Sequence, residues 1–97
     1  MSSNLRQLAN RLTFRQLQVF LVVHELRSYS KAGAQLGLTQ PAVSSQMRQI
    51  EEALGLPLFD YVGRRLYSTA AGERLATAST AIFTELERLQ TELAALH

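Results

Sequence analysis

The sequence predicts a mainly α-helical domain in which three helices lead into a short β-hairpin and one longer helix follows. Apolar residues recur at steps of three and four over most of the chain, which is the spacing of helices with a buried face. Between Leu58 and Ser68, aromatic and β-branched residues instead flank Gly63 and Arg64, which is the pattern of a two-stranded hairpin. The 97 residues, 46% of them hydrophobic, suffice for one domain with its own core.

The first predicted helix begins at a capping box, because Thr13 is followed three residues later by Gln16. Its core-facing positions are Leu17, Phe20, Leu21 and His24. Further apolar residues widen this surface beyond one face: Val19, Val22, Val23 and Leu26. We therefore expect the helix to contact both the core and a second chain, through Val19, Val23 or Leu26, and to end near Arg27. Residues 1–12 are expected to form a leader that docks through Leu5, Leu8 and Leu12.

A short second helix and a third helix are predicted to meet at a glycine turn. Ser30 is the expected N-cap of the second helix, which runs to Leu36 and ends at Gly37 in the left-handed conformation. Thr39 should cap the third helix, whose first turn tolerates Pro41 because no N–H is needed there. The third helix should continue to about Leu54.

The last predicted helix is long and carries a heptad seam. Thr69 is its expected N-cap. With Ser79 included, the seam positions alternate at steps of four and three, which favours pairing with a second long helix. The seam positions expected to form the homodimer are Leu75, Ile82, Leu86, Leu89, Leu93 and Leu96.

Two helices joined by a tight turn and followed by a hairpin are typical of a winged helix-turn-helix. One face of the third helix is polar, and the major groove of B-DNA admits one such helix. Short side chains near the helix start allow close approach, so Pro41 and Ala42 could touch thymine methyls. The Ser45 hydroxyl could donate or accept a hydrogen bond, and Gln49 could bond adenine bidentately. The alternative is a helical protein-interaction module in which this face is simply solvated.

The charge distribution agrees weakly with a polyanionic partner. Residues 1–72 hold eight Lys and Arg against four acids, a balance of +4, whereas residues 73–97 hold two Arg against four Glu, a balance of −2. The absence of cysteine excludes disulfides and thiolate sites. The sequence shows no phosphate loop, metal cluster or catalytic triad, so we expect no enzyme activity, no cofactor and no metal. Its longest apolar run is too short for a membrane span.

Three segments carry a family resemblance: LxxF in residues 17–20, SKAGAQLGLTQPAVSSQMRQIEEALGLPLF in residues 30–59 and TAAG in residues 69–72. In these motifs the chain resembles the N-terminal DNA-binding domain of LysR-type bacterial transcriptional regulators, from about Thr13 to Gly72. Within that family, LTFRQLQVF, LTQPAVSSQ and LPLFDYVGRRLYST look most similar to regulators of Calvin-cycle carbon-fixation operons. The chain departs from the usual family pattern at Gly33, Tyr61 and Ser68, where alanine, arginine and leucine are typical. Because Tyr61 replaces a cation, no phosphate contact is assigned to it.

The resemblance implies an organisation in three parts: a leader at 1–12, a winged helix-turn-helix at 13–68 and a linker helix for dimerisation at 69–97. It implies sequence-specific binding to double-stranded operator DNA in the cytoplasm, with the third helix, about 39–54, in the major groove and the wing, 58–68, on the minor groove or backbone. It also implies antiparallel pairing of the long helices, and a larger effector-sensing domain beyond His97. We therefore expect the chain to be a fragment, the full-length protein to be a tetramer and any small-molecule effector to act through that domain.

Further contacts are expected to phosphate or to the minor groove. Arginines at the hairpin tip suit a narrow minor groove, and helix N-termini favour phosphate. For Arg48 the alternative is an ion pair with Glu51 or Glu52. The residues expected to make such contacts are Ser30, Lys31, Thr39, Gln40, Ser44, Arg48, Arg64 and Arg65.

Overall fold

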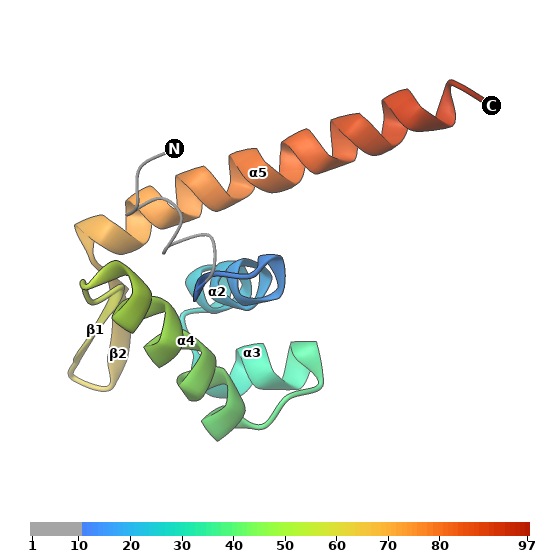
Figure 1. Ribbon diagram of the computed structural model, residues 1–97. Helices are drawn as coiled ribbons and strands as arrows, with labels where there is room; N and C mark the ends of the chain where they lie inside the picture. Colours follow the sequence, from blue (N-terminus) through green and yellow to red (C-terminus); the bar gives the residue numbers. More distant parts are fainter. Residues whose placement is uncertain (1–10) are drawn as a thin grey trace.

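A computed structural model describes residues 11–97 and shows a small helical body from which one long helix projects (Figure 1). The elements in chain order are α2 (Phe14–Leu26), α3 (Tyr29–Leu36), α4 (Gln40–Leu54), β1 (Phe59–Val62), β2 (Arg65–Ser68) and α5 (Ala70–Ala94). The predicted winged helix-turn-helix with a long final helix is confirmed. Of the expected leader, Leu5 and Leu8 lie outside the described residues, and Leu12 packs against the core.

One hydrophobic core holds α2, α3, α4 and the hairpin together. Its fully buried side chains come from all of these elements, with Phe20 on α2, Met47 and Ile50 on α4 and Leu58 just before β1. Phe59 extends the core, because its ring lies 5.6 Å from that of Phe20 between centroids. The hairpin is therefore anchored in the body at its base, and only its tip is free.

Most predicted caps are confirmed. Thr13 and Gln16 form the reciprocal capping box of α2, and Thr39 and Thr69 accept hydrogen bonds from the backbone N–H groups of Ala42 and Gly72. Gly37 ends α3 with φ 71°, a left-handed conformation that favours glycine.

The predicted N-cap of α3 is wrong by two residues. Ser28, not Ser30, caps the helix, and its hydroxyl accepts a hydrogen bond from the Lys31 backbone N–H at 3.1 Å. The helix therefore includes Tyr29, whose half-buried ring packs near that of Tyr61 on the hairpin, 6.5 Å apart between centroids. This contact explains why the helix starts earlier than its second serine suggests.

The hairpin turns at two residues with positive φ, Gly63 at 56° and Arg64 at 65°, as in the tight turns that suit twisted strands. Three hydrogen bonds fix its base. The Leu58 N–H donates to Glu51 Oε2 of α4 at 2.7 Å, the Leu58 carbonyl accepts from the Thr69 N–H at 3.0 Å, and the Thr69 hydroxyl donates to the Pro57 carbonyl at 2.7 Å. The base is thus tied both to α4 and to the start of α5.

The expectation that Val19 and Val23 of α2 contact a second chain is wrong. Both are fully buried in the core of their own chain, and only Leu26 remains partly exposed. Packing against α3, α4 and α5 uses more of the α2 surface than a single helical face supplies. None of the helices in residues 11–97 has the length and apolar character needed to cross a bilayer.

Candidate nucleic-acid interface

The start of α4 and the tip of the hairpin project on the same side of the body, and α5 lies on the opposite side (Figure 1). The α3–α4 turn makes this projection possible. Gly33 approaches the turn so closely that an added Cβ would lie 2.6 Å from the Leu38 carbonyl oxygen, and the Leu38 N–H bonds to the Gly33 carbonyl at 2.8 Å. The turn thus sets the direction of α4, so that Val43 packs into the core and the polar side of the first half of the helix faces outward.

The four residues predicted to read bases lie on the open side of α4. Pro41 and Gln49 are exposed, and Ala42 and Ser45 are half-buried. The opposite side is fully buried through Val43, Met47 and Ile50. The helix therefore presents short and polar groups outward, and its geometry suits insertion into a groove whose floor carries hydrogen-bonding atoms.

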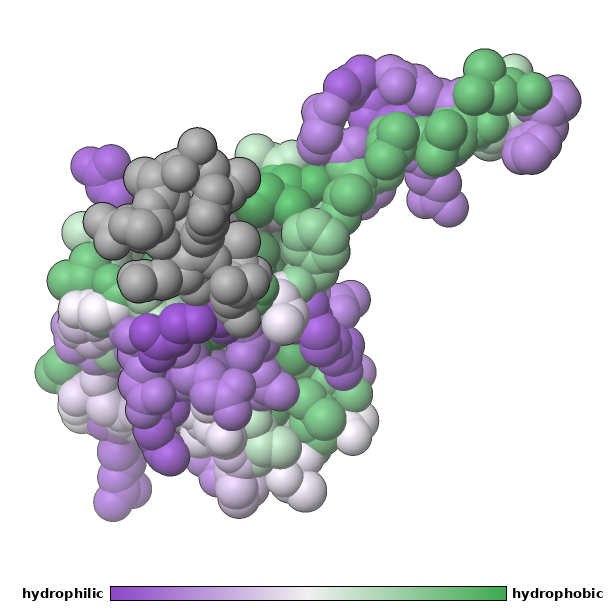
Figure 2. Space-filling model, viewed as in Figure 1, coloured by the Kyte–Doolittle hydropathy of each residue, from purple (hydrophilic) through white to green (hydrophobic). Residues whose placement is uncertain are grey.

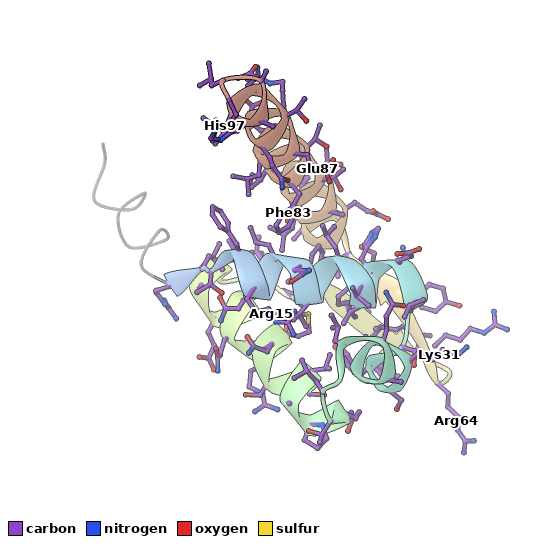
Figure 3. All side chains as sticks on the ribbon, turned by 90° about the vertical axis from the view of Figure 1, so that its right-hand side faces the viewer. Arg15, Lys31, Arg64, Phe83, Glu87 and His97 are labelled. Atoms are coloured by element: carbon purple, nitrogen blue, oxygen red, sulfur yellow. The ribbon has the colours of Figure 1, made fainter. Side chains whose placement is uncertain are left out.

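Exposed cations surround this face. In Figure 3 Arg64 extends from the hairpin tip, far from the end of α5 that carries Glu87 and His97, and Lys31 lies at the same edge of the view. Arg48 and Arg65 are also exposed. Within residues 11–97 none of these four cations forms an ion pair. Their charge is therefore available to an anionic ligand.

The ion pair considered for Arg48 is not formed. Glu51 instead accepts the hydrogen bond from the Leu58 N–H, and Glu52 makes no ion pair within the described part of the chain. By contrast, Arg27 pairs with Glu73 near the start of α5, at 3.7 Å.

The remaining predicted contacts are polar groups near the start of α3 and α4. Ser30 is exposed in the first turn of α3. Thr39 accepts from the Ala42 N–H at 3.2 Å, which leaves its O–H free to donate. Gln40 Nε2 donates to Ser44 Oγ at 3.1 Å, so these two side chains are already joined across one turn. Thr39, Gln40 and Ser44 thus lie at the N-terminus of α4, where the helix dipole favours an anion.

Two glutamine side chains have roles that were not predicted from the sequence. Gln16 is buried and its Nε2 donates to Gln49 Oε1 at 2.9 Å, which joins α2 to α4. Gln46 is half-buried on α4, one turn after Ala42, and its Oε1 has no hydrogen-bond partner in the described structure. The helical spacing 42, 45, 46, 49 places Gln46 on the same face and could have indicated it. No local pattern could have indicated the contact between Gln16 and Gln49, because it spans 33 residues.

Tyr61 is exposed on the hairpin, beside the Tyr29 ring. Burial raises the pKa of the Tyr29 hydroxyl above its ordinary value, and the nearby Glu51 carboxylate adds to the effect. Tyr29 therefore stays protonated and uncharged at neutral pH.

A row of exposed apolar side chains lies on α5, and Figure 2 shows it as a hydrophobic row along the projecting half of the helix. Four of the predicted seam residues, Ile82, Leu86, Leu89 and Leu93, are exposed. The first residues of the seam contribute to the chain's own core instead, because Leu75 packs against it and Ser79 is fully buried. Leu96 lies beyond the end of the helix and is highly exposed.

His24 is part of a structural contact. Its Nε2 lies 2.8 Å from Glu73 Oε2, so the end of α2 is tied to the first turn of α5. Among residues 11–97 there is no group of three or more His, Cys, Asp or Glu side chains able to hold a metal ion.

A family model described as "Bacterial regulatory helix-turn-helix protein, lysR family" matches residues 14–73. The chain belongs to the LysR family. The match begins at the first residue of α2 and ends in the first turn of α5, so it includes every element of the candidate interface.

Three members of the comparison are informative. The RuBisCO operon transcriptional regulator of Acidithiobacillus ferrooxidans is 46% identical over 84 residues, which is 87% of this chain and 27% of that protein. The CbbR regulator of Xanthobacter flavus is 40% identical over 84 residues, which is 87% of this chain and 25% of that protein. The crystal structure of a CbnR DBD–DNA complex has a TM-score of 0.81 at 29% identity, and the match covers 88% of this chain and 98% of that one. The chain thus spans about a quarter of the length of these LysR-family relatives and nearly the whole of a LysR-family domain that binds DNA.

Proposed function

We propose that this LysR-family chain binds double-stranded DNA sequence-specifically as a homodimer, with α4 in the major groove and the hairpin tip on the minor groove or backbone. The observation that carries the proposal is the shared placement of two features. The start of α4, which has exposed polar side chains, and the hairpin tip, where Arg64 and Arg65 are exposed, lie on the side of the body away from α5. Double-stranded DNA fits such a surface, because its phosphates are anionic and its base edges carry hydrogen-bonding groups.

The proposed roles divide into reading and positioning. Pro41, Ala42, Ser45 and Gln49 face base edges, because they occupy the open side of α4 near its start. Phosphate or minor-groove contacts carry no direct sequence information but supply affinity. These contacts are proposed for Ser30, Lys31, Thr39, Gln40, Ser44, Arg48, Arg64 and Arg65.

The dimer is proposed to form through the exposed part of α5. Ile82, Leu86, Leu89 and Leu93 make a continuous apolar row on a helix that otherwise projects into solvent. An exposed apolar row of this kind indicates an interaction surface, and a second copy of the same helix presents a matching apolar row to cover it. Leu75 is left out of this surface because it packs in its own core. Leu96 lies beyond the end of α5, so it adds to the surface only when the chain end packs against the partner helix.

The similarity to RuBisCO operon regulators supports a role in controlling a carbon-fixation operon in the bacterial cytoplasm. In this proposal the chain acts by binding alone, without catalysis, and responses to a small-molecule effector or assembly to a tetramer are assigned to the remaining length that the relatives have beyond the quarter matched here. Residues 13–68 are proposed to read DNA and residues 69–97 to join the two copies, a division supported by the end of β2 at Ser68 and the start of α5 at Ala70.

A salt series tests the proposal. Duplexes selected from a random library by the 97-residue chain are compared with scrambled duplexes of the same composition between low and moderate salt. Specific DNA should bind at least about a thousandfold more tightly than scrambled DNA, and both affinities should fall steeply with salt. Equal, weak binding to both duplexes at every salt concentration would favour the protein-interaction module instead.

A further inference from the structure

A chain of hydrogen bonds runs from the start of α2 to the exposed face of α4. The Thr13 backbone N–H donates to Gln16 Oε1 at 3.0 Å, and Gln16 Nε2 donates to Gln49 Oε1 at 2.9 Å. Gln16 is 7% exposed, whereas Gln49 is exposed. A buried carboxamide thus connects a helix cap to a residue on the proposed reading surface.

The direction of every bond in this chain is determined by its first member. A backbone N–H can only donate, so the Gln16 atom that faces it must be the carbonyl oxygen. A planar carboxamide has one acceptor end and one donor end, so the end of Gln16 that faces α4 must be the –NH2 group. Gln49 must then meet it with its own oxygen, since two –NH2 groups cannot bond to each other.

This constraint orients the carboxamide of Gln49 toward an external ligand. Its oxygen is turned toward α2, and its Nε2 has no hydrogen-bond partner among residues 11–97. The outward end of the side chain is therefore a donor. The bidentate adenine contact considered from the sequence needs the oxygen and the nitrogen of Gln49 on the groove side together, which this arrangement does not provide.

We infer that Gln16 is a positioning residue that sets base specificity: through the capping box of α2 it holds the Gln49 carboxamide so that an N–H donor faces the DNA. The inference rests on the proposed function and specifies it at one base pair in each half-site. In the major groove, guanine offers two acceptors, N7 and O6, and thymine offers O4, whereas cytosine offers the N4 donor. Gln49 should accordingly favour guanine or thymine over cytosine at the position it faces.

Gln16→Glu inverts this arrangement without removing the cap. Glutamate is as suitable as glutamine at this position of a capping box, so one carboxylate oxygen still accepts from the Thr13 N–H. The other oxygen can only accept, so Gln49 must rotate its amide and donate to it. The Gln49 oxygen then faces outward and accepts from a base.

The experiment measures base preference with this chain on a duplex selected from a random library, using all single-base variants of one half-site. In Gln16→Glu, the ratio of affinities for an acceptor base and for cytosine should change by about fivefold or more at one position, toward cytosine. Gln18→Glu is the matched control, because it adds the same charge on an exposed position of α2 and should leave every ratio unchanged. In a Gln49→Ala background, Gln16→Glu should have no effect on any ratio.

A second variant keeps the test valid if Gln16→Glu does not fold. Gln49→Glu lies at an exposed site, keeps an acceptor toward Gln16 and presents a second acceptor to the DNA, so it should shift the same position toward cytosine. The inference is overturned if the wild-type chain and Gln49→Glu share one base preference, or if Gln16→Glu weakens all duplexes equally. A wild-type chain with no base preference anywhere would instead defeat the proposed function itself.

Discussion

Charge placed on the exposed row of α5 should separate the two copies of the chain. The chosen change is Leu86→Lys with Leu89→Lys, because both side chains are exposed and lie in the second half of α5. Within residues 11–97 neither residue belongs to the core or packs against it, so the fold of the monomer should survive. The variant should therefore report on assembly alone.

The exposed fractions set the expected size of the effect. Leu86 is 37% exposed and Leu89 is 47% exposed, so a partner helix that covers both would bury about 0.84 of one leucine side chain in each copy. At about 2 kcal/mol for one leucine, this contributes about 1.7 kcal/mol per copy and about 3.4 kcal/mol per dimer. Losing it raises the dimer Kd by about 300-fold, and the repulsion between lysines adds to this loss.

Sedimentation equilibrium of the 97-residue chain at micromolar concentration measures the effect. The wild type should be dimeric, and the double variant should be monomeric and bind a full operator much more weakly than the wild type while half-site binding stays similar. Thr84→Lys with Thr91→Lys is the control, because it adds the same charge on the opposite face of α5, where both threonines are exposed. A wild type that is monomeric at this concentration and binds DNA as one copy would refute the reasoning, as would equal dimerisation of the variant and the control.

Four further outcomes are expected. Ser45→Ala should lower discrimination between operator variants by about 1 kcal/mol, and competition binding that weakens equally on every sequence would reduce Ser45 to a backbone contact. Replacing Arg64 and Arg65 by alanine should flatten the slope of log affinity against log salt by about 1–2 units, and an unchanged slope would remove the hairpin tip from the interface. Gly72→Ala should lower stability in thermal unfolding by about 1–3 kcal/mol, because the new Cβ would lie 2.3 Å from the Leu58 carbonyl oxygen; a wild-type melting temperature would contradict this. Inserting five base pairs between the two halves of a selected operator should weaken dimer binding to nearly half-site affinity in gel-shift titration, and unchanged affinity would show flexible joining of the two copies.

Local hydrogen bonds explain which features of the fold could be predicted from the sequence. Caps such as Thr13, Thr39 and Thr69 accept hydrogen bonds from residues three positions further along the chain. Gly37 and Gly55 end helices in a left-handed conformation that few other residues adopt. Each of these helix ends can therefore be predicted from the local sequence alone. The start of α3 was misplaced because two serines compete there, and a tertiary contact to the hairpin favours the earlier one.

Burial on α2 and α5 could not be predicted because it depends on packing between elements. The sequence pattern of a valine beside an apolar face is the same whether the valine contacts its own core or a second chain. Val19 and Val23 proved to be core residues. The heptad periodicity of α5 likewise includes Leu75 and Ser79 without interruption. The body of the domain covers these two residues, however, and the seam becomes exposed only from Ile82.

In the candidate site, too, features set by the local sequence were predictable and features set by contacts between elements were not. The open face of α4 was predictable because helical periodicity separates Ser45 from Val43 and Met47. The orientation of Gln49 was not, because it depends on Gln16 across 33 residues of chain.

The connections between α4, the hairpin and α5 explain why the spacing of the two reading helices should be fixed. Glu51 holds the Leu58 N–H from the α4 side, and Thr69 holds the Leu58 carbonyl from the α5 side. Gly72 presses against the same carbonyl with no room for a side chain. A rotation of α5 relative to α4 must therefore break hydrogen bonds to the buried Leu58 backbone at a closely packed site, at a cost of about 1–3 kcal/mol for each buried group left unpaired. In the proposed dimer, the pairing of two α5 helices thus determines where both copies of α4 lie, and the operator should have the same two-fold symmetry.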